Sequence, residues 1–432
     1  MTGSRNSSVQ RALGMASAGA GVVGSYLGYA LQRAFLGEAE SKAKLKATHR
    51  RAARRVADEM KSLRGAAMKI GQTLSLQTGT LPEEALAEFA TLQMNAPPMH
   101  PSLVRVQFSR SMGAEPEEVF KEFTPEPFAA ASLGQVHHAV TRAGERVAVK
   151  IQYPGIREAI ENDFKVFRTV TRPAQTTGHV PGAAIDEVEQ QILGETDYKR
   201  EGQNIEFFRK RLAPLSFVQV PRFLPAYSSD KVLTMTLMRG RHLEEFLAQR
   251  PSQKLRDELA ARLFELFYFQ VLQIGALHAD PHWGNYLFSK GAEIALVDFG
   301  CAKQMLPASV AYLRSVFLYP GSTHSAEFKQ LVEKYYQELG QKLLPPARKA
   351  LLGFADNFYR KVYPPGVESE QPFDFGDPKF LQDFLSESTN LFRTKGVLTE
   401  LIFMGRAEMG LYQTLHRLKA RVHTSQIVRK YV

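Results

Sequence analysis

The sequence predicts an α+β protein of two lobes, in which a small lobe that contains a sheet precedes a larger, mainly helical lobe. The chain has 432 residues, of which 44% are hydrophobic, and this is enough for two or three domain-sized cores. Residues 128–155 alternate apolar and polar positions with the period of a strand. A strongly apolar run at residues 259–277 begins a region that is expected to be mainly helical and to continue to the C-terminus.

Residues 1–37 are predicted to form a membrane-associating or transmembrane segment. Within it, residues 12–31 are uncharged, about the length that spans a bilayer, and basic residues flank them on both sides. Gly24 and Gly28 are four residues apart, the spacing at which two membrane helices approach closely, so a homodimer is an open alternative. A mobile tail and an organelle transit peptide are the other interpretations of this segment.

The positive charge of the chain is concentrated at its start. Residues 1–70 hold 13 Lys or Arg and four acidic residues, a net charge of +9 out of the total of +11. A basic run beside an apolar run favours anionic membrane lipid as a partner over nucleic acid. The single cysteine, Cys301, excludes internal disulfides and indicates a reducing compartment.

Residues 38–110 are predicted to form a helical extension. Apolar residues recur at spacings of four and three from Val56 to Leu74, which is typical of an amphipathic helix. Lys69 and Gln72 lie three residues apart on this helix and therefore on neighbouring surface.

Residues 111–240 are predicted to form the small lobe. Valine and isoleucine alternate with Ala148 and Lys150 after a turn, which predicts a hairpin whose lysine faces away from the valines. Val-Ala-Val-Lys at residues 147–150 matches the strand of protein kinases whose lysine binds the α- and β-phosphates of ATP.

A loop rich in small residues precedes this hairpin, where it would lie over the phosphates. Its residues are Ala129, Ala130, Ala131 and Ser132, followed by Leu133 and Gly134. Because alanine resists positive φ, this loop should be stiffer than the glycine-rich loop of kinases.

One long helix is predicted over residues 185–208, and a strand over residues 231–237. The helix contains Glu195, Asp197 and Glu201, and one of these carboxylates is expected to form an ion pair with Lys150.

Residues 241–432 are predicted to form the helical lobe, which contains the strongest local motif. Asp280 precedes Asn285 by five residues, and a short hairpin then leads to Asp298 in an Asp-Phe-Gly sequence. Protein kinases use this order and spacing for the catalytic aspartate and for the two side chains that hold magnesium. The pattern predicts that ATP and Mg²⁺ are the cofactors.

Three further features have structural alternatives. His278 and His282 resemble metal ligands, but without cysteine or glutamate partners a structural role is favoured over zinc. A second Asp-Phe-Gly begins at Asp374 and is interpreted as structural, because no strand is predicted before it. The segment after Cys301 is too short for an activation segment that binds a protein substrate.

Together these motifs resemble the UbiB family of atypical, protein-kinase-like proteins, whose eukaryotic members include the ADCK proteins. Lys69-Ile70-Gly71-Gln72 resembles the KxGQ signature of that family, the alanine-rich loop its replacement of the glycine loop, and Glu195-Thr196-Asp197 its ExD element. The resemblance implies a two-lobed, protein-kinase-like fold in which Lys150 pairs with Glu201. It also implies that Lys69 and Gln72 lie across the cleft near Glu195.

The resemblance further assigns the roles of the nucleotide site. It implies that Asp298 and Asn285 bind Mg²⁺, that Asp280 orients or deprotonates the attacking group, and that backbone around Met238 contacts the adenine. Thr236 stands where the family usually has a glutamate.

The implied function is Mg-dependent ATP hydrolysis or atypical kinase activity at a membrane, in support of ubiquinone biosynthesis. Quinone precursors and biosynthetic enzymes are the implied partners, and the cytoplasmic face of a bacterial inner membrane is the favoured location over the mitochondrial inner membrane. A kinase for a small molecule or lipid, and a non-catalytic scaffold switched by ATP, are the alternatives.

Overall fold

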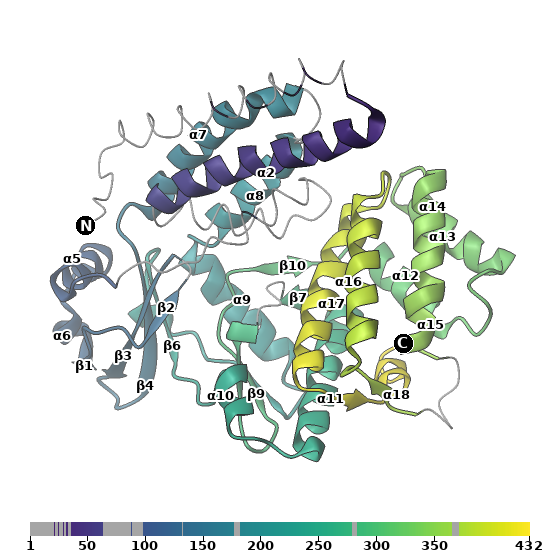
Figure 1. The fold of residues 1–432 in the computed structure, drawn as a ribbon. Coiled ribbons are helices and arrows are strands. Elements are labelled where there is room, and N and C mark those ends of the chain that lie inside the picture. The colour runs from purple at the N-terminus through teal and green to yellow at the C-terminus, as the bar shows by residue number, and fades with distance from the viewer. Residues whose placement is uncertain are drawn as a thin grey trace. The chain divides into compact units, whose positions relative to one another are not determined.

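The computed structural model describes residues 21, 25, 29, 32, 36–63, 88, 98–131, 133–176, 182–278, 283–364 and 371–432 (Figure 1). Lys69, Gln72, Ser132 and Asp280 lie outside the described residues, as does most of the apolar segment at residues 12–31. Within the described part of the chain, none of the helices has the length and apolar character that crossing a bilayer requires.

The chain forms two compact units, which are described separately. Unit 1 comprises residues 1–200 and 224–235, and unit 2 comprises residues 201–223 and 236–432. The division passes through helix α9 (Tyr198–Arg211) and through the end of strand β6 (Val232–Thr236).

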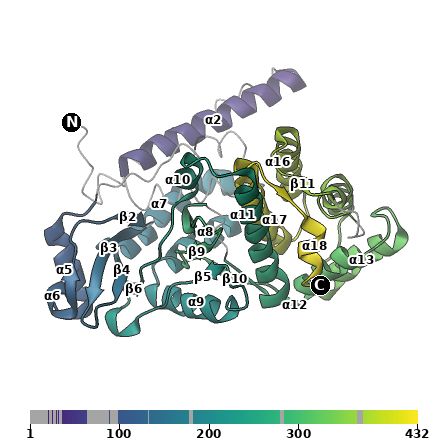
Figure 2. The ribbon, with the colours of Figure 1, turned by 90° about the horizontal axis from the view of Figure 1, so that it is seen from below.

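Unit 1 contains a mixed set of helices and one sheet. Its helices are α2 (Glu38–Leu63), α5 (Pro101–Met112), α6 (Pro116–Val119), α7 (Ile156–Thr176) and α8 (Gly182–Gly194). Its strands are β1 (Phe120–Phe123), β2 (Ala129–Ala131), β3 (Gly134–Thr141), β4 (Arg146–Gln152) and β6. The sheet has the order β1-β3-β4-β6, and β2 also pairs with β3. Strands β2, β3, β4 and β6 of this sheet are labelled in Figure 2.

The predicted hairpin is confirmed as the antiparallel pair of β3 and β4, in which Val136 lies opposite Lys150. Val147, Val149 and Ile151 are fully buried in a hydrophobic core that includes Phe108 and Phe120. Because side chains alternate along a strand, Lys150 projects from the opposite face of β4. The predicted strand at residues 231–237 is also confirmed, as β6.

The prediction of one helix over residues 185–208 is wrong. Helix α8 ends at Gly194, and α9 begins at Tyr198 after a turn. Asp197 stabilises the start of α9, because its Oδ1 accepts a hydrogen bond from the Arg200 amide at 3.0 Å. Gly194 and the polar residues at 195–197 interrupt the apolar spacing at this turn, and the expectation of one continuous helix passed over that interruption.

Unit 2 is mainly helical. Its helices include α10 (Leu243–Ala248), α11 (Gln253–Phe269), α12 (Pro307–Leu318), α13 (Ala326–Glu338), α14 (Pro345–Phe354), α15 (Arg360–Val362), α16 (Pro378–Arg393), α17 (Thr399–Arg417) and α18 (Thr424–Arg429). Its strands are β5 (Val218–Gln219), β7 (Ala276–His278), β8 (Tyr286–Phe288), β9 (Ile294–Leu296), β10 (Ala302–Gln304), β11 (Phe373–Asp374) and β12 (Arg421–Val422). They form the sheets β5-β9-β8, β10-β7 and β11-β12.

The apolar run predicted as helical over residues 259–277 changes structure before its end. Ser252 caps α11, and a π-helical turn (Gln270–Ile274) follows the helix. Gly275 then adopts φ 65°, a left-handed conformation that commonly ends helices and that glycine adopts without strain. The last two residues of the region belong to β7 instead, which leads into the motif containing Asp280.

Candidate active site

Asn285 and Asp298 lie at the same end of the β8–β9 hairpin. The two strands are antiparallel, with Tyr286 opposite Leu296, and the Val297 amide donates a hydrogen bond to the Asn285 carbonyl at 3.1 Å. Asp298 is the next residue after that pair. The register therefore places two residues that are 13 positions apart in the sequence at one end of the hairpin.

The backbone around Asp298 is held by several hydrogen bonds. Its Oδ1 accepts one from the Gly300 amide at 2.9 Å, and its carbonyl oxygen contacts Nε2 of His278. The His278 amide in turn donates to Oε1 of Gln270, in the π-helical turn, at 2.8 Å. His278 is thus buried in this site, and His282, its partner in the prediction of a structural role, lies outside the described residues.

Helix α9 holds the next residue, Phe299, from two positions. Glu201 is buried, and its Oε1 accepts a hydrogen bond from the Phe299 amide at 3.4 Å. Asn204 donates from Nδ2 to the Phe299 carbonyl at 2.9 Å. Asn204 is not among the residues predicted from the sequence, although its position one helical turn after Glu201 places both side chains on one face. The Phe299 ring packs on Phe208 of the same helix, with centroids 5.8 Å apart.

Among the described residues, the oxygen donors of this hairpin fit Mg²⁺. Magnesium is usually held by one or two side-chain oxygens together with substrate phosphates, and the carboxylate of Asp298 and the amide oxygen of Asn285 are donors of that type. The Asn285 Nδ2 atom is buried and makes no hydrogen bond within the described part of the chain. The Asn285 amide is therefore not fully used by the fold. No cluster of three His, Cys, Asp or Glu side chains occurs among the described residues.

In unit 1, Lys150 lies on β4 with 5% of its surface exposed. Its Nζ is 5.1 Å from the centroid of the Tyr198 ring, close enough for a cation–π interaction. Gly134 of the neighbouring strand has no room for a side chain, because a Cβ there would collide with the Ile151 carbonyl. The lysine is thus held in a tightly packed hairpin rather than on a free surface.

The alanine-rich segment is a strand, not a loop, over its described part. Ala129, Ala130 and Ala131 form β2, paired antiparallel with residues 134–136 of β3. Ala130 is exposed and its two neighbours are partly exposed. Hydrogen bonds to β3 restrain the backbone of residues 129–131. That the whole segment is stiffer than the glycine-rich loop of kinases stays a prediction.

Glu195 and Asp197 lie in the turn between α8 and α9, and this turn is attached to β4. The buried Thr196 accepts a hydrogen bond at its carbonyl from Nε2 of Gln152, at 2.6 Å. Gln152 is two residues from Lys150, so the two elements are held in a fixed relation within unit 1. Glu195 is partly exposed and Asp197 is exposed.

The segment after β6 contains Met238, which is partly exposed. Thr236, where the family usually has a glutamate, has a structural role. Its Oγ1 accepts a hydrogen bond from the Arg222 amide at 2.9 Å, and its own amide donates to the Arg222 carbonyl at 3.0 Å. The threonine therefore secures the end of β6.

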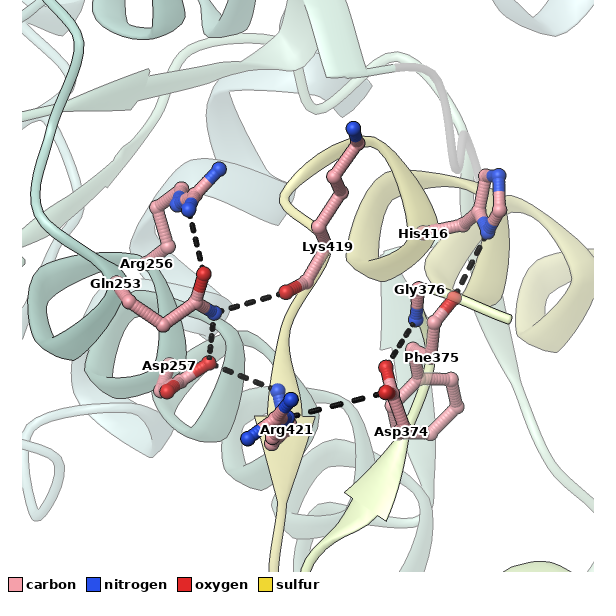
Figure 3. Close-up of polar contacts among 9 residues, drawn as sticks. All are labelled: Gln253, Arg256, Asp257, Asp374, Phe375, Gly376, His416, Lys419 and Arg421. Carbon is pink, nitrogen blue, oxygen red and sulfur yellow. Dashed lines mark hydrogen bonds and ion pairs between the residues drawn. The ribbon is translucent and has the colours of Figure 1, made fainter. Parts of the chain in front are cut away.

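The second Asp-Phe-Gly, at residues 374–376, repeats the local geometry of the first. Asp374 Oδ1 accepts a hydrogen bond from the Gly376 amide at 2.8 Å (Figure 3). Its other contacts belong to the fold: Oδ2 is 3.8 Å from Nε of Arg421, and the Phe375 carbonyl contacts Nδ1 of His416 at 2.8 Å. The expectation that no strand precedes this motif is wrong, since Asp374 ends β11, a two-residue strand that pairs with β12.

The segment after Asp298 is short in the structure. Strand β10 pairs antiparallel with β7, and only two residues separate the end of β10 at Gln304 from the start of α12 at Pro307. This stretch has no room for a long segment that could position a peptide substrate.

A profile of the ABC1 atypical kinase-like domain matches residues 91–332, more than half of the chain. The chain is 31% identical over 286 residues to the atypical kinase coq-8, mitochondrial, of Caenorhabditis elegans, a match that covers 64% of this chain and 37% of the relative. It is 29% identical over 269 residues to the atypical kinase COQ8, mitochondrial, of Saccharomyces cerevisiae, covering 61% and 53%. The matched part of the chain thus spans between 37% and 53% of the length of these two relatives.

A solved structure described as a complex of Rv3197 with erythromycin from Mycobacterium tuberculosis has a TM-score of 0.61. The sequences are 24% identical, and the match covers 92% of this chain and 98% of the other. This likeness supports the predicted α+β, kinase-like fold. Since the domain profile spans every candidate site residue from Ala129 to Asp298, the chain belongs to the ABC1 atypical kinase-like family, that is, the UbiB and ADCK family.

Proposed function

We propose that this protein binds ATP with Mg²⁺ and hydrolyses it, or transfers its phosphate to a small acceptor, beside a membrane in support of ubiquinone biosynthesis. The observation that supports the nucleotide chemistry best is the register of β8 and β9, which brings Asn285 and Asp298 together. Kinases hold magnesium with these two residue types in this order.

Each residue has a distinct part in this proposal. Asp298 and Asn285 would hold Mg²⁺, and the bound ion would neutralise negative charge on the phosphate oxygens. Lys150 binds the α- and β-phosphates, and Glu201 orients Lys150. Glu201 also accepts from the Phe299 amide, so it fixes the backbone beside Asp298. Asp280 orients or deprotonates the attacking water or hydroxyl.

The roles of Ala129–Ala131 and Ser132 over the phosphates, of Met238 at the adenine, and of Lys69, Gln72, Glu195 and Asp197 in a family-specific cleft are proposed from the family. The short connection between β10 and α12 favours water or a small acceptor over a protein substrate. The support for the quinone pathway is the kinship with the COQ8 atypical kinases.

The chain offers a matched pair of variants for the test. Asp298→Asn removes a proposed magnesium ligand, whereas Asp374→Asn changes the same motif, with the same Asp-to-Gly hydrogen bond, at a place outside the proposed site. ATP binding and turnover are measured for both variants and the wild type, with Mg²⁺ or with EDTA, and with or without anionic liposomes.

The wild type should bind ATP only with Mg²⁺ and turn it over faster with liposomes. Asp298→Asn should weaken Mg²⁺-dependent binding by about 10- to 100-fold, by analogy with the loss of one metal-supporting group. Asp374→Asn should behave as the wild type. If the wild type binds no nucleotide under any of these conditions, the proposal is wrong.

Asp280→Asn separates the enzyme from an ATP-switched scaffold. In cells of the source organism whose own copy is replaced, an enzyme with this variant should lose ubiquinone production while still binding ATP. A scaffold would keep ubiquinone production, and that result would refute catalysis.

A further inference from the structure

Unit 2 contains a cavity to which the proposed ATP chemistry assigns no role. Helices α12, α13, α14, α16 and α17 and the π-helical turn Ala355–Tyr359 enclose about 70 Å³. Apart from the hydroxyls of Tyr312 and Tyr359, its wall has two polar groups, Ser388 on α16 and Glu408 on α17, and these two helices lie side by side (Figure 1). A buried water needs roughly 10–15 Å³, so the space accepts a molecule of about the size of one ring. None of the candidate active-site residues lines it.

The wall of the cavity is mainly apolar and rich in aromatic side chains. Six aromatic residues line it: Tyr312, Phe328, Phe354, Tyr359, Phe384 and Phe392. Aromatic rings attract cations at their faces, and they also pack well against the apolar part of a ligand.

One of the two polar groups, the Ser388 hydroxyl, is not satisfied by the fold. Ser388 lies on α16 with 1% of its surface exposed, and its Oγ has no hydrogen-bond partner among the described residues. A buried hydroxyl without a partner is costly, typically about 1–3 kcal/mol. Such a group at a cavity wall is available to a ligand.

The other polar group is the carboxyl of Glu408 on α17, which is 6% exposed. Its Oε1 accepts hydrogen bonds from the hydroxyls of Tyr268 at 2.6 Å, Tyr363 at 3.0 Å and Tyr412 at 2.9 Å. All three hydroxyls bind the same oxygen and none binds Oε2. Glu408 forms no ion pair with the lysines or arginines of the described chain. Burial raises the pKa of this carboxyl, and the three hydroxyls offset the effect only in part.

Three features of the cavity determine which ligand chemistry fits it: the fixed carboxyl of Glu408, the aromatic wall and the unsatisfied hydroxyl of Ser388. An anion would be repelled by the Glu408 carboxylate, whose ionised form the three donated hydrogen bonds favour, and a neutral hydrocarbon would leave Ser388 and Glu408 unmatched. An amine supplies the missing positive charge and up to three hydrogen-bond donors. The fold has already removed the carboxyl from water, so on binding only the amine has to be desolvated.

We propose that this cavity binds a small hydrophobic amine, whose ammonium group pairs with Glu408 and donates to Ser388 while its ring fills the aromatic wall. The inference does not depend on the ATP chemistry, because no residue is shared.

The test measures binding of four probes of one shape to the full chain by calorimetry at neutral pH: benzylamine, benzyl alcohol, toluene and benzoate. Benzylamine should bind at least about tenfold more tightly than benzyl alcohol, as expected for a desolvated cation beside rings and a carboxylate. Benzoate should not bind. Equal binding of benzylamine, benzyl alcohol and toluene would refute the proposal, as would no binding of benzylamine at millimolar concentration.

Three variants locate the binding. Glu408→Gln should remove the preference for the amine, and Ser388→Ala should weaken benzylamine binding several-fold. Ser309→Ala is the matched control, since Ser309 is equally buried, has a partner in Tyr335 and lies outside the cavity wall.

A fourth variant tests the location of the site even if Glu408→Gln does not fold. Ala355→Leu fills the cavity without touching the tyrosine network, and should abolish binding of every probe while circular dichroism shows the native helix content. If Ala355→Leu still binds benzylamine as the wild type does, the site lies elsewhere and the proposal is wrong.

Discussion

At the scale of single residues, identical side chains acquire different roles from their surroundings. Asp298 and Asp374 each accept a hydrogen bond from the glycine two residues later. Asp298 lies beside Asn285 through the register of a hairpin, whereas Asp374 lies beside Arg421 at the end of a two-residue strand. The motif alone cannot distinguish them, since their difference comes from residues distant in sequence.

His137 provides a pH-dependent prediction. It is fully buried, with Nε2 3.0 Å from Nε2 of Gln135 and Nδ1 3.0 Å from the Thr124 carbonyl. Gln135 also accepts from the Met99 amide at 2.8 Å, so the network supports a neutral ring that donates from Nδ1. Burial lowers the pKa of His137.

The sign of the effect follows from proton binding. Above about pH 6.5 the histidine is neutral in both states, and it adds no pH dependence. Below that pH the unfolded chain binds a proton that the native state resists, so the free energy of unfolding falls until the pH reaches the folded pKa. Each unit of depression is worth about 1.4 kcal/mol.

Urea unfolding at pH 8, 6.5 and 5 checks this prediction. The loss of stability on acidification should be smaller in His137→Gln than in the wild type. His138→Gln, at the exposed neighbouring position, is the control and should keep the full loss. An unchanged pH dependence in His137→Gln would show that other groups cause it.

At the scale of elements, the turn between α8 and α9 attaches the helices to strand β4, which a continuous helix could not do. It places Thr196 against Gln152 and ends one helix so that the next starts at Tyr198. Each helix buries an apolar face, but Gly194 and the three polar residues after it interrupt the apolar spacing between them. The capping interaction of Asp197 decides where the second helix begins.

Asp197 therefore has two candidate roles, which its variants separate. Asp197→Ala removes the cap and should cost about 1 kcal/mol of stability. Asp197→Ser keeps a capping oxygen but loses the charge, so it should retain most of the stability. If ATP turnover is lost in both variants, the carboxylate itself is needed; recovery of turnover in Asp197→Ser would reduce its role to capping.

The end of α11 shows the same limit of sequence patterns. The apolar run continues from helix into β7, and only Gly275 indicates where the helix stops. The apolar sequence indicates that both elements are buried, but it does not indicate which of them is a helix and which is a strand. The pairing of β7 with β10 settles the conformation.

At the scale of the whole molecule, the basic start of the chain gives a prediction about membranes. Helix α2 contains Arg50, Arg51 and Arg54, all exposed. A basic residue near an anionic membrane is worth about 1 kcal/mol, so replacing these three with Gln should weaken vesicle binding by about 100-fold.

Sedimentation of phosphatidylserine vesicles with the full chain measures this effect, and binding should also fall with salt. The control replaces three exposed lysines of unit 2 with Gln: Lys329, Lys342 and Lys349. If both triple variants bind equally, α2 is not the membrane contact.

The amino-acid sequence was enough to predict the α+β class, the family, the β3–β4 hairpin and the order of the candidate nucleotide-site residues. These follow from strand periodicity and from spacings within short motifs, which are local properties of the chain. Three features emerged from the three-dimensional packing: the attachment of residues 195–197 to β4, the hydrogen bonds of Glu201 and Asn204 to Phe299, and the cavity beside Glu408. Each of these depends on which distant residues pack together, and neighbours along the chain do not encode that directly.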